Sequence, residues 1–149
     1  MKQMIIIIAI LAIFVSCKDS TEKIEMEFLT RTFDSSSIQL RNYKWIIILP
    51  GIGCHGCVQE GELFMKRNID KHNVLYILTR LSSIKILQQK IGINLKECSN
   101  IYIDRDDMFF IPTENAIYPC VIKLENGKII SHIFQNPRND AFGEIVFDE

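Results

Sequence analysis

The chain contains 149 residues, which is long enough for one domain with its own hydrophobic core. Its charges nearly balance, with 17 Lys and Arg against 18 Asp and Glu and a formal net charge of −1. Since the sequence has no basic stripe and no basic patch interleaved with aromatic residues, we expect no nucleic-acid partner.

The N-terminus has the pattern of an export signal. One lysine precedes twelve unbroken apolar residues, at positions 4–15. A helix that spans a bilayer needs about 20 such residues, whereas a shorter run is typical of the core of a secretory signal. The run ends at Ser16-Cys17, which resembles the lipobox of bacterial lipoproteins. The resemblance predicts a signal peptide over residues 1–16 and a lipid on the Cys17 thiol. The alternative is an ordinary signal peptide with an incidental cysteine.

An exported chain lies outside the cytoplasm, where disulfides persist. Residues 17–37 are polar and charged, and we interpret them as a tether to the membrane; the stretch at 22–33 has an ambiguous period. Residues 38–149 are predicted to form the folded domain. Four cysteines remain besides Cys17: Cys54, Cys57, Cys98 and Cys120. Four cysteines allow three pairings, and the sequence alone does not choose among them.

The domain begins with alternating strand and helix patterns. The isoleucine-rich run at 43–49, closed by Pro50 and Gly51, predicts a strand that is buried on both faces. Residues 54–68 have apolar side chains at near-helical intervals. The apolar run at 73–79 predicts a second buried strand.

The second half contains one more helix, one more strand and a hairpin. The segment 82–92 reads as a helix that Ser82 or Ser83 caps and Gly92 ends. Residues 100–104 predict a third strand. Residues 120–134 predict a hairpin, because Asn126-Gly127 supplies the positive φ angles of a two-residue turn.

The order of these elements predicts an α/β domain with a mixed sheet flanked by helices and a C-terminal β-hairpin. Strands separated by helices pair in parallel through right-handed crossovers, and the hairpin adds an antiparallel pair. Cys54 and Cys57 then stand after the first long strand, where a helix begins. Backbone N–H groups and the helix dipole favour a thiolate at that position.

This arrangement resembles the thioredoxin fold, and more closely the TlpA/ResA-like membrane-anchored thiol-disulfide oxidoreductases. The resemblance rests on the sequence IQLRNYKWIIILPGIGCHGC, on the C-x-x-C-x-x-E pattern from Cys54 to Glu60, on Tyr118-Pro119 before the hairpin, and on the N-terminal anchor. It covers nearly all of the chain after the signal. The chain departs from the family where Gly53 replaces a tryptophan and where the last helix is reduced to a short segment with a glycine.

The resemblance implies a mechanism of thiol–disulfide exchange. Cys54 is the attacking cysteine, Cys57 the resolving one, and Glu60 assists proton movement at Cys57. His55 is either a group that stabilises the thiolate or a solvated loop residue.

The resemblance also implies a substrate groove that Tyr118 and Pro119 shape. A cis Tyr118–Pro119 bond would turn the Tyr118 backbone towards the substrate and bring Cys120 near the cysteine pair as a third thiol. The expected partners are protein thiols and disulfides, an upstream redox protein, and the membrane of a bacterial cell envelope through the lipid. No cofactor and no metal are expected.

Other uses of the cysteine pair fit the sequence less well. Val58 occupies the position where covalent haem attachment needs histidine, and Gly51 the position where a peroxiredoxin has Thr or Ser. A zinc site usually needs a second Cys or His pair at short spacing. A structural disulfide across so short a loop would stabilise little. The main alternative is a non-catalytic thioredoxin-fold lipoprotein that holds a protein partner or a metal.

Overall fold

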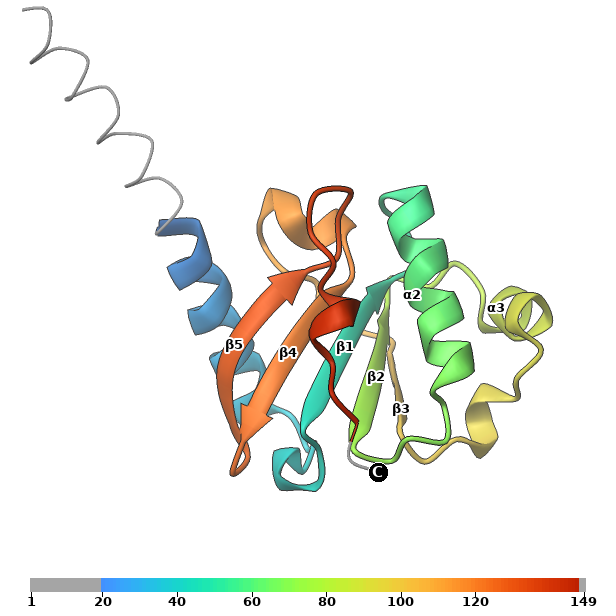
Figure 1. Cartoon of the computed structure of the whole chain (residues 1–149), viewed down its shortest axis with the longest axis horizontal. Coiled ribbons are helices and arrows are strands. Elements are labelled where there is room, and N and C mark those ends of the chain that lie inside the picture. The colour runs from blue at the N-terminus through green and yellow to red at the C-terminus, as the bar shows by residue number, and fades with distance from the viewer. Residues whose placement is uncertain (1–19, 148–149) are drawn as a thin grey trace, which may run out of the picture.

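The structure is a computed structural model that describes residues 20–147 of the chain. Its centre is a five-stranded sheet in the order β3-β2-β1-β4-β5 (Figure 1). β1 (Trp45–Pro50), β2 (Val74–Thr79) and β3 (Ile101–Asp104) are parallel to one another. β4 (Cys120–Glu125) and β5 (Lys128–Phe134) form a hairpin, and β4 runs antiparallel to β1. The predicted mixed α/β sheet of thioredoxin-like type with a C-terminal hairpin is therefore confirmed.

The expected local signals define these elements. Every residue of β1 and β2 is buried, as their continuous apolar runs predict. α2 (His55–Arg67) begins directly after Cys54, and α3 (Ile84–Ile91) begins after Ser83, whose side chain accepts a hydrogen bond from the Ile86 N–H. Gly92 ends α3 with a φ of 73°. The hairpin turn has φ angles of 52° at Asn126 and 76° at Gly127, as its residue types predict.

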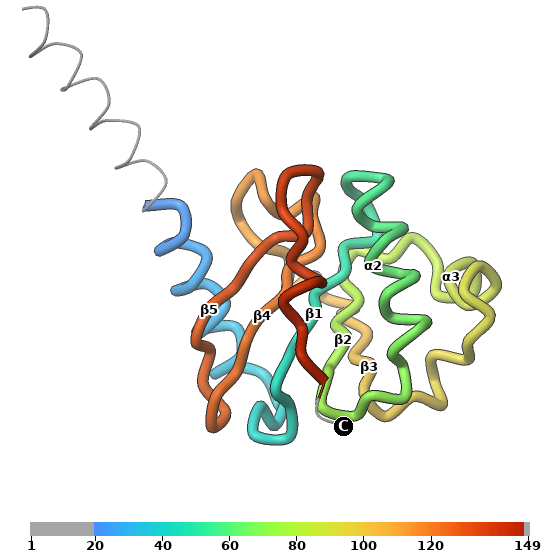
Figure 2. The backbone as a smooth tube through the Cα atoms, viewed as in Figure 1, coloured from blue at the N-terminus to red at the C-terminus, as the bar shows by residue number. Residues whose placement is uncertain are grey.

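Two hydrophobic clusters cover the two faces of the sheet. The first cluster packs β-strand side chains such as Ile47 and Leu49 against Met65 of α2, Leu87 of α3 and the C-terminal segment. That segment contains the short 3-10 helix η4 (Phe142–Glu144) in place of a long last helix, and its tube crosses the sheet in Figure 2. α2 and α3 therefore lie on the same face of the sheet as the C-terminal segment.

The second cluster lies on the opposite face and includes an N-terminal helix over residues 20–35. Leu29 and Phe33 of this helix are buried against Ile46, Ile48 and Cys120 from the sheet. The stretch at 22–33, whose period was ambiguous in the sequence, is thus helical and packs onto the domain. Three further 3-10 helices complete the described chain: η1 (Leu40–Asn42), η2 (Leu95–Glu97) and η3 (Glu114–Ile117).

The predicted signal peptide over residues 1–16 and the predicted lipid site at Cys17 lie outside the described residues. Within residues 20–147, no helix is both long enough and apolar enough to span a membrane.

Candidate functional site at the start of α2

Cys54 and Cys57 form a disulfide at the N-terminal end of α2. Cys54 is the N-cap residue and is partly exposed, whereas Cys57 lies in the first turn of the helix and is 5% exposed. The bond thus presents one sulfur-bearing residue at the surface and keeps the other inside. This asymmetry allows a partner to reach Cys54 more readily than Cys57.

A close approach between two loops holds Cys54 in place. The Cys54 N–H donates a hydrogen bond to the Ile117 carbonyl at 2.9 Å. A Cβ atom at Gly53 would lie 2.2 Å from that same carbonyl oxygen, so a side chain at position 53 would displace the loop. Gly53, which replaces the tryptophan of the resembled family, is therefore the residue that lets the loop before α2 meet the loop before β4.

A second glycine brings α2 close to the sheet. A Cβ atom at Gly61 would lie 2.6 Å from Leu49 Cδ2 and 3.3 Å from Pro119 Cγ. Cys57, Val58, Gly61 and Met65 form the buried face of α2, with the spacing of an amphipathic helix. Pro119 therefore packs against the helix that carries the cysteine pair.

The predicted cis bond between Tyr118 and Pro119 is wrong, because the described residues contain no cis peptide bond. Tyr118 has φ −108° and ψ 148°, the extended conformation that a residue before proline prefers. Its N–H donates to the Asn115 carbonyl at 2.9 Å, which ends η3. The trans form is also favoured intrinsically by about 0.5–1 kcal/mol. Pro119 thus serves to lead the chain into β4, and the Tyr118 N–H is already engaged within the protein.

Cys120 does not belong to the surface that presents Cys54. It is fully buried in the second cluster, on the face of the sheet opposite to α2. Burial, and then the negative charge of Glu25, raise the pKa of the Cys120 thiol well above its ordinary value. The predicted role of Cys120 as a third thiol depended on a cis Tyr118–Pro119 bond, and this structure does not support it.

Glu60 lies on α2 three residues after Cys57 and is exposed. Its Oε2 accepts a hydrogen bond from Gln135 Nε2 at 2.9 Å. Sequence reasoning did not find Gln135, which directly follows β5 and is 4% exposed. No local signal marks Gln135, since a single amide after a strand resembles any loop residue. His55, the first residue of α2, is exposed, and its side chain makes no hydrogen bond or ion pair with the rest of residues 20–147.

A buried polar network, also missed from the sequence, lies on the other face of the sheet. Glu25 of the N-terminal helix is 2% exposed and binds three side chains. Thr113 Oγ1 and Asn115 Nδ2 donate to its Oε1 at 2.6 and 2.8 Å. His132 Nε2 lies 2.8 Å from its Oε2. The network thus attaches the helix to β5 and to η3.

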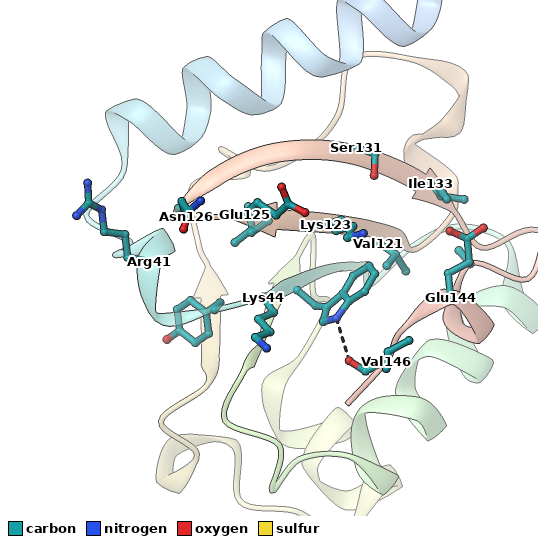
Figure 3. A pocket seen from close by; sticks show the side chains of 15 residues that line it. Arg41, Lys44, Val121, Lys123, Glu125, Asn126, Ser131, Ile133, Glu144 and Val146 are labelled. Carbon is teal, nitrogen blue, oxygen red and sulfur yellow. Dashed lines mark hydrogen bonds between the residues drawn. The ribbon is translucent and has the colours of Figure 1, made fainter. Parts of the chain in front are cut away.

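A sizeable hollow in the described part of the chain lies away from the disulfide. It encloses about 610 Å³ and lies at the end of β1 where Trp45 starts the strand, whereas the cysteine pair lies beyond the opposite end of β1. Figure 3 shows it between the β4–β5 hairpin and the C-terminal segment, where Trp45 Nε1 donates to the Val146 carbonyl. Side chains of both charges line it: Arg41, Lys44 and Lys123, with Glu125 and Glu144. It contains none of the residues that the sequence pointed to.

The fold and the disulfide together define a thioredoxin-like α/β domain with a Cys-x-x-Cys pair at a helix start. Such a pair is compatible with thiol–disulfide exchange. Comparisons with protein-family models, with curated proteins and with solved structures find no match. Among residues 20–147, no group of three or more His, Cys, Asp or Glu side chains is arranged to hold a metal ion.

Proposed function

We propose that this protein is a thiol-disulfide oxidoreductase of the TlpA/ResA-like type, which exchanges electrons with protein disulfides through Cys54 and Cys57. The observation that supports the proposal most strongly is the placement of the disulfide, with Cys54 partly exposed at the N-terminus of α2 and Cys57 buried behind it. In the reduced protein, the α2 dipole and the free N–H groups of its first turn favour a thiolate at this position.

The proposed reaction has two steps. The Cys54 thiolate attacks one sulfur of a partner disulfide, forms a mixed disulfide and releases the partner's second sulfur as a thiolate. Cys57 then loses its proton, which Glu60 accepts, and attacks Cys54 Sγ. This step releases the partner's remaining thiolate and leaves the Cys54–Cys57 disulfide. The partner gains two electrons and the protein loses them, and a second redox protein restores the dithiol. The reverse sequence oxidises a partner.

We further propose that the protein is a lipoprotein of a bacterial cell envelope. The support is the sequence alone: an apolar run of twelve residues that ends at Ser16-Cys17. A lipid on Cys17 would anchor the domain to the membrane outside the cytoplasm, through the few residues that precede the N-terminal helix. Its substrates would then be exported proteins that contain thiols or disulfides.

A trapping experiment tests the proposed exchange. We expect Cys57→Ser protein, mixed in reduced form with a peptide that contains one disulfide, to accumulate a mixed disulfide through Cys54. The matched Cys54→Ser protein should accumulate little adduct through Cys57, because that cysteine is buried. Both variants keep the free, partly exposed Cys98, so only adducts through Cys54 and Cys57 are compared. Peptide mass spectrometry identifies the linkage. Absence of the adduct from Cys57→Ser protein, or equal amounts from both variants, would refute the assignment.

The trans Tyr118–Pro119 bond and Gly53 favour a second candidate, a thioredoxin-fold lipoprotein that holds a protein partner or a metal without turnover. The same experiment distinguishes the two functions, because a binding protein would form no mixed disulfide with the peptide. A second measurement uses oxidised wild-type protein: in a binding protein, the Cys54–Cys57 bond would persist when the peptide dithiol is added.

A further inference from the structure

Gln135 connects three segments that meet beside the cysteine pair. Its backbone N–H donates to the Pro119 carbonyl at 2.8 Å. Its side chain donates from Nε2 to Glu60 on α2, at 2.9 Å, and accepts at Oε1 from the Phe142 N–H of η4, at 3.1 Å. This buried amide is a fixed group, because its two side-chain hydrogen bonds restrict the same torsions, χ1 to χ3, while the third bond holds the backbone at the same residue.

The chemistry of the partners determines which way the amide faces. The Phe142 N–H can only donate, so it selects the amide oxygen, and the NH₂ group is left to face Glu60. That hydrogen bond is charge-assisted when Glu60 is ionised. Gln135 is therefore oriented by the backbone of η4 to hold a carboxylate of α2.

Without this contact, little else would restrain Glu60. The residue is exposed and lines, with Gly56 and Phe142, a hollow of about 420 Å³ that runs along α2. An exposed glutamate has several rotamers of similar energy, and without a partner its carboxylate would move among them in water. The bond to Gln135 selects among them.

We propose that Gln135 is a positioning residue that holds the Glu60 carboxylate for proton transfer at Cys57. This inference rests on the proposed function, since it assigns to Gln135 a role in the resolving step. Because Gln135 also binds the Pro119 carbonyl, it fixes Glu60 relative to the loop that meets Cys54. Gln135 acts through Glu60 and does not touch the reacting sulfurs.

The test compares Gln135→Met in two backgrounds, the wild type and Glu60→Gln. Methionine keeps the length of the side chain but neither donates to Glu60 nor accepts from Phe142. The measurement is the single-turnover release of a disulfide-bonded peptide, with the peptide in excess so that the resolving step limits the rate. In the wild-type background we expect release to slow about tenfold, less than the roughly hundredfold that a 1 Å misplacement of a reacting group can cost. In the Glu60→Gln background we expect no further slowing.

Thermal unfolding of the same four proteins separates this role from a structural one. The Phe142 N–H loses its partner in both backgrounds, so the melting temperature should fall by a similar amount in each. If Gln135→Met does not fold, Gln135→Glu replaces it, because that residue keeps an acceptor for Phe142 and removes the donor to Glu60. We expect Gln135→Glu to slow release in the wild-type background as well.

The outcomes separate the inference from the proposed function. Slowing by the same factor in both backgrounds, or unchanged release in Glu60→Gln protein, overturns the role of Gln135 while exchange itself stands. Wild-type protein that releases no peptide overturns the proposed function, and the role of Gln135 with it.

Discussion

The carboxylate of Glu25 is the buried group whose loss should cost the domain most. Glu25→Ala removes one acceptor group from three partners: Thr113, Asn115 and His132. Because Glu25 is 2% exposed, water does not readily replace it. Removal of one member of a buried pair typically costs about 3–5 kcal/mol of unfolding free energy, most of it from the polar partners that are left unpaired. We expect a loss in this range.

Two matched variants give the estimate its controls. Glu25→Gln keeps the size of the side chain and an acceptor oxygen for Thr113 and Asn115, so it should cost less than Glu25→Ala. Glu22→Ala removes an exposed glutamate from the preceding turn of the same helix and should stay within about 0.5 kcal/mol of the wild type.

Urea unfolding of the oxidised protein gives the unfolding free energy of all three variants, from the transition midpoint and from the slope of that free energy against urea concentration. If Glu25→Ala detaches the N-terminal helix before the rest of the domain unfolds, the slope falls as well, because less surface is then exposed in the main transition. A loss for Glu25→Ala no larger than that for Glu22→Ala would refute the reasoning.

Three further predictions concern other residues. Gly53→Ala should lower the melting temperature of the oxidised protein and slow exchange, because its Cβ would lie 2.2 Å from the Ile117 carbonyl oxygen. Gly56→Ala, whose Cβ would have no atom within 4 Å, should leave the melting temperature unchanged or raise it, and equal effects of the two variants would contradict the packing. Burial and the charge of Glu25 raise the pKa of the Cys120 thiol, so its thiolate forms only at high pH. We therefore expect Cys120 to resist alkylation in native protein at pH 7 to 9 and to react only after unfolding. Mass spectrometry of labelled peptides tests this, and labelling of native protein near neutral pH would contradict it. Fatty-acid labelling in a bacterial host should mark the wild type but not Cys17→Ala, and equal labelling of both would refute the lipid site.

Local signals in the sequence predicted most of the fold. The runs that became β1 and β2 are apolar at every position but the last, and a strand buried on both faces needs such a run. The hairpin turn follows from Asn126-Gly127 and the end of α3 from Gly92, since both depend on backbone angles that few residue types adopt. The cysteine pair at the start of α2 was equally readable, because the loop follows a strand and precedes a helical pattern.

The N-terminal helix was harder to predict, because its buried face is not uniformly apolar. Its fully packed positions are Glu25, Leu29, Thr32 and Phe33, which do follow a helical period. A glutamate and a threonine at two of these positions hide the period from any reading that counts apolar residues alone. The signal exists in the spacing, but recognising it requires knowledge that Glu25 has buried partners.

Those partners lie too far along the chain for a local pattern to reveal them. Glu25 and His132 are 107 residues apart, and Glu60 and Gln135 are 75 apart. The proline isomer also depends on context, because the Asn115 carbonyl and the entry to β4 surround the Tyr118–Pro119 bond. Each of these features depends on contacts between segments that the sheet brings together.

The end of β5 therefore has a specific place in the architecture. His132 lies on the face of the sheet that the N-terminal helix covers, and Gln135, three residues later, contacts α2 on the other face. Hydrogen-bonded polar pairs fix direction and distance more narrowly than apolar packing does. A hydrogen bond weakens steeply when its donor–acceptor distance grows by a few tenths of an ångström above the optimum or when it is poorly aligned. One strand end thus fixes two helices: the helix that follows the predicted lipid anchor and the helix that carries the cysteine pair.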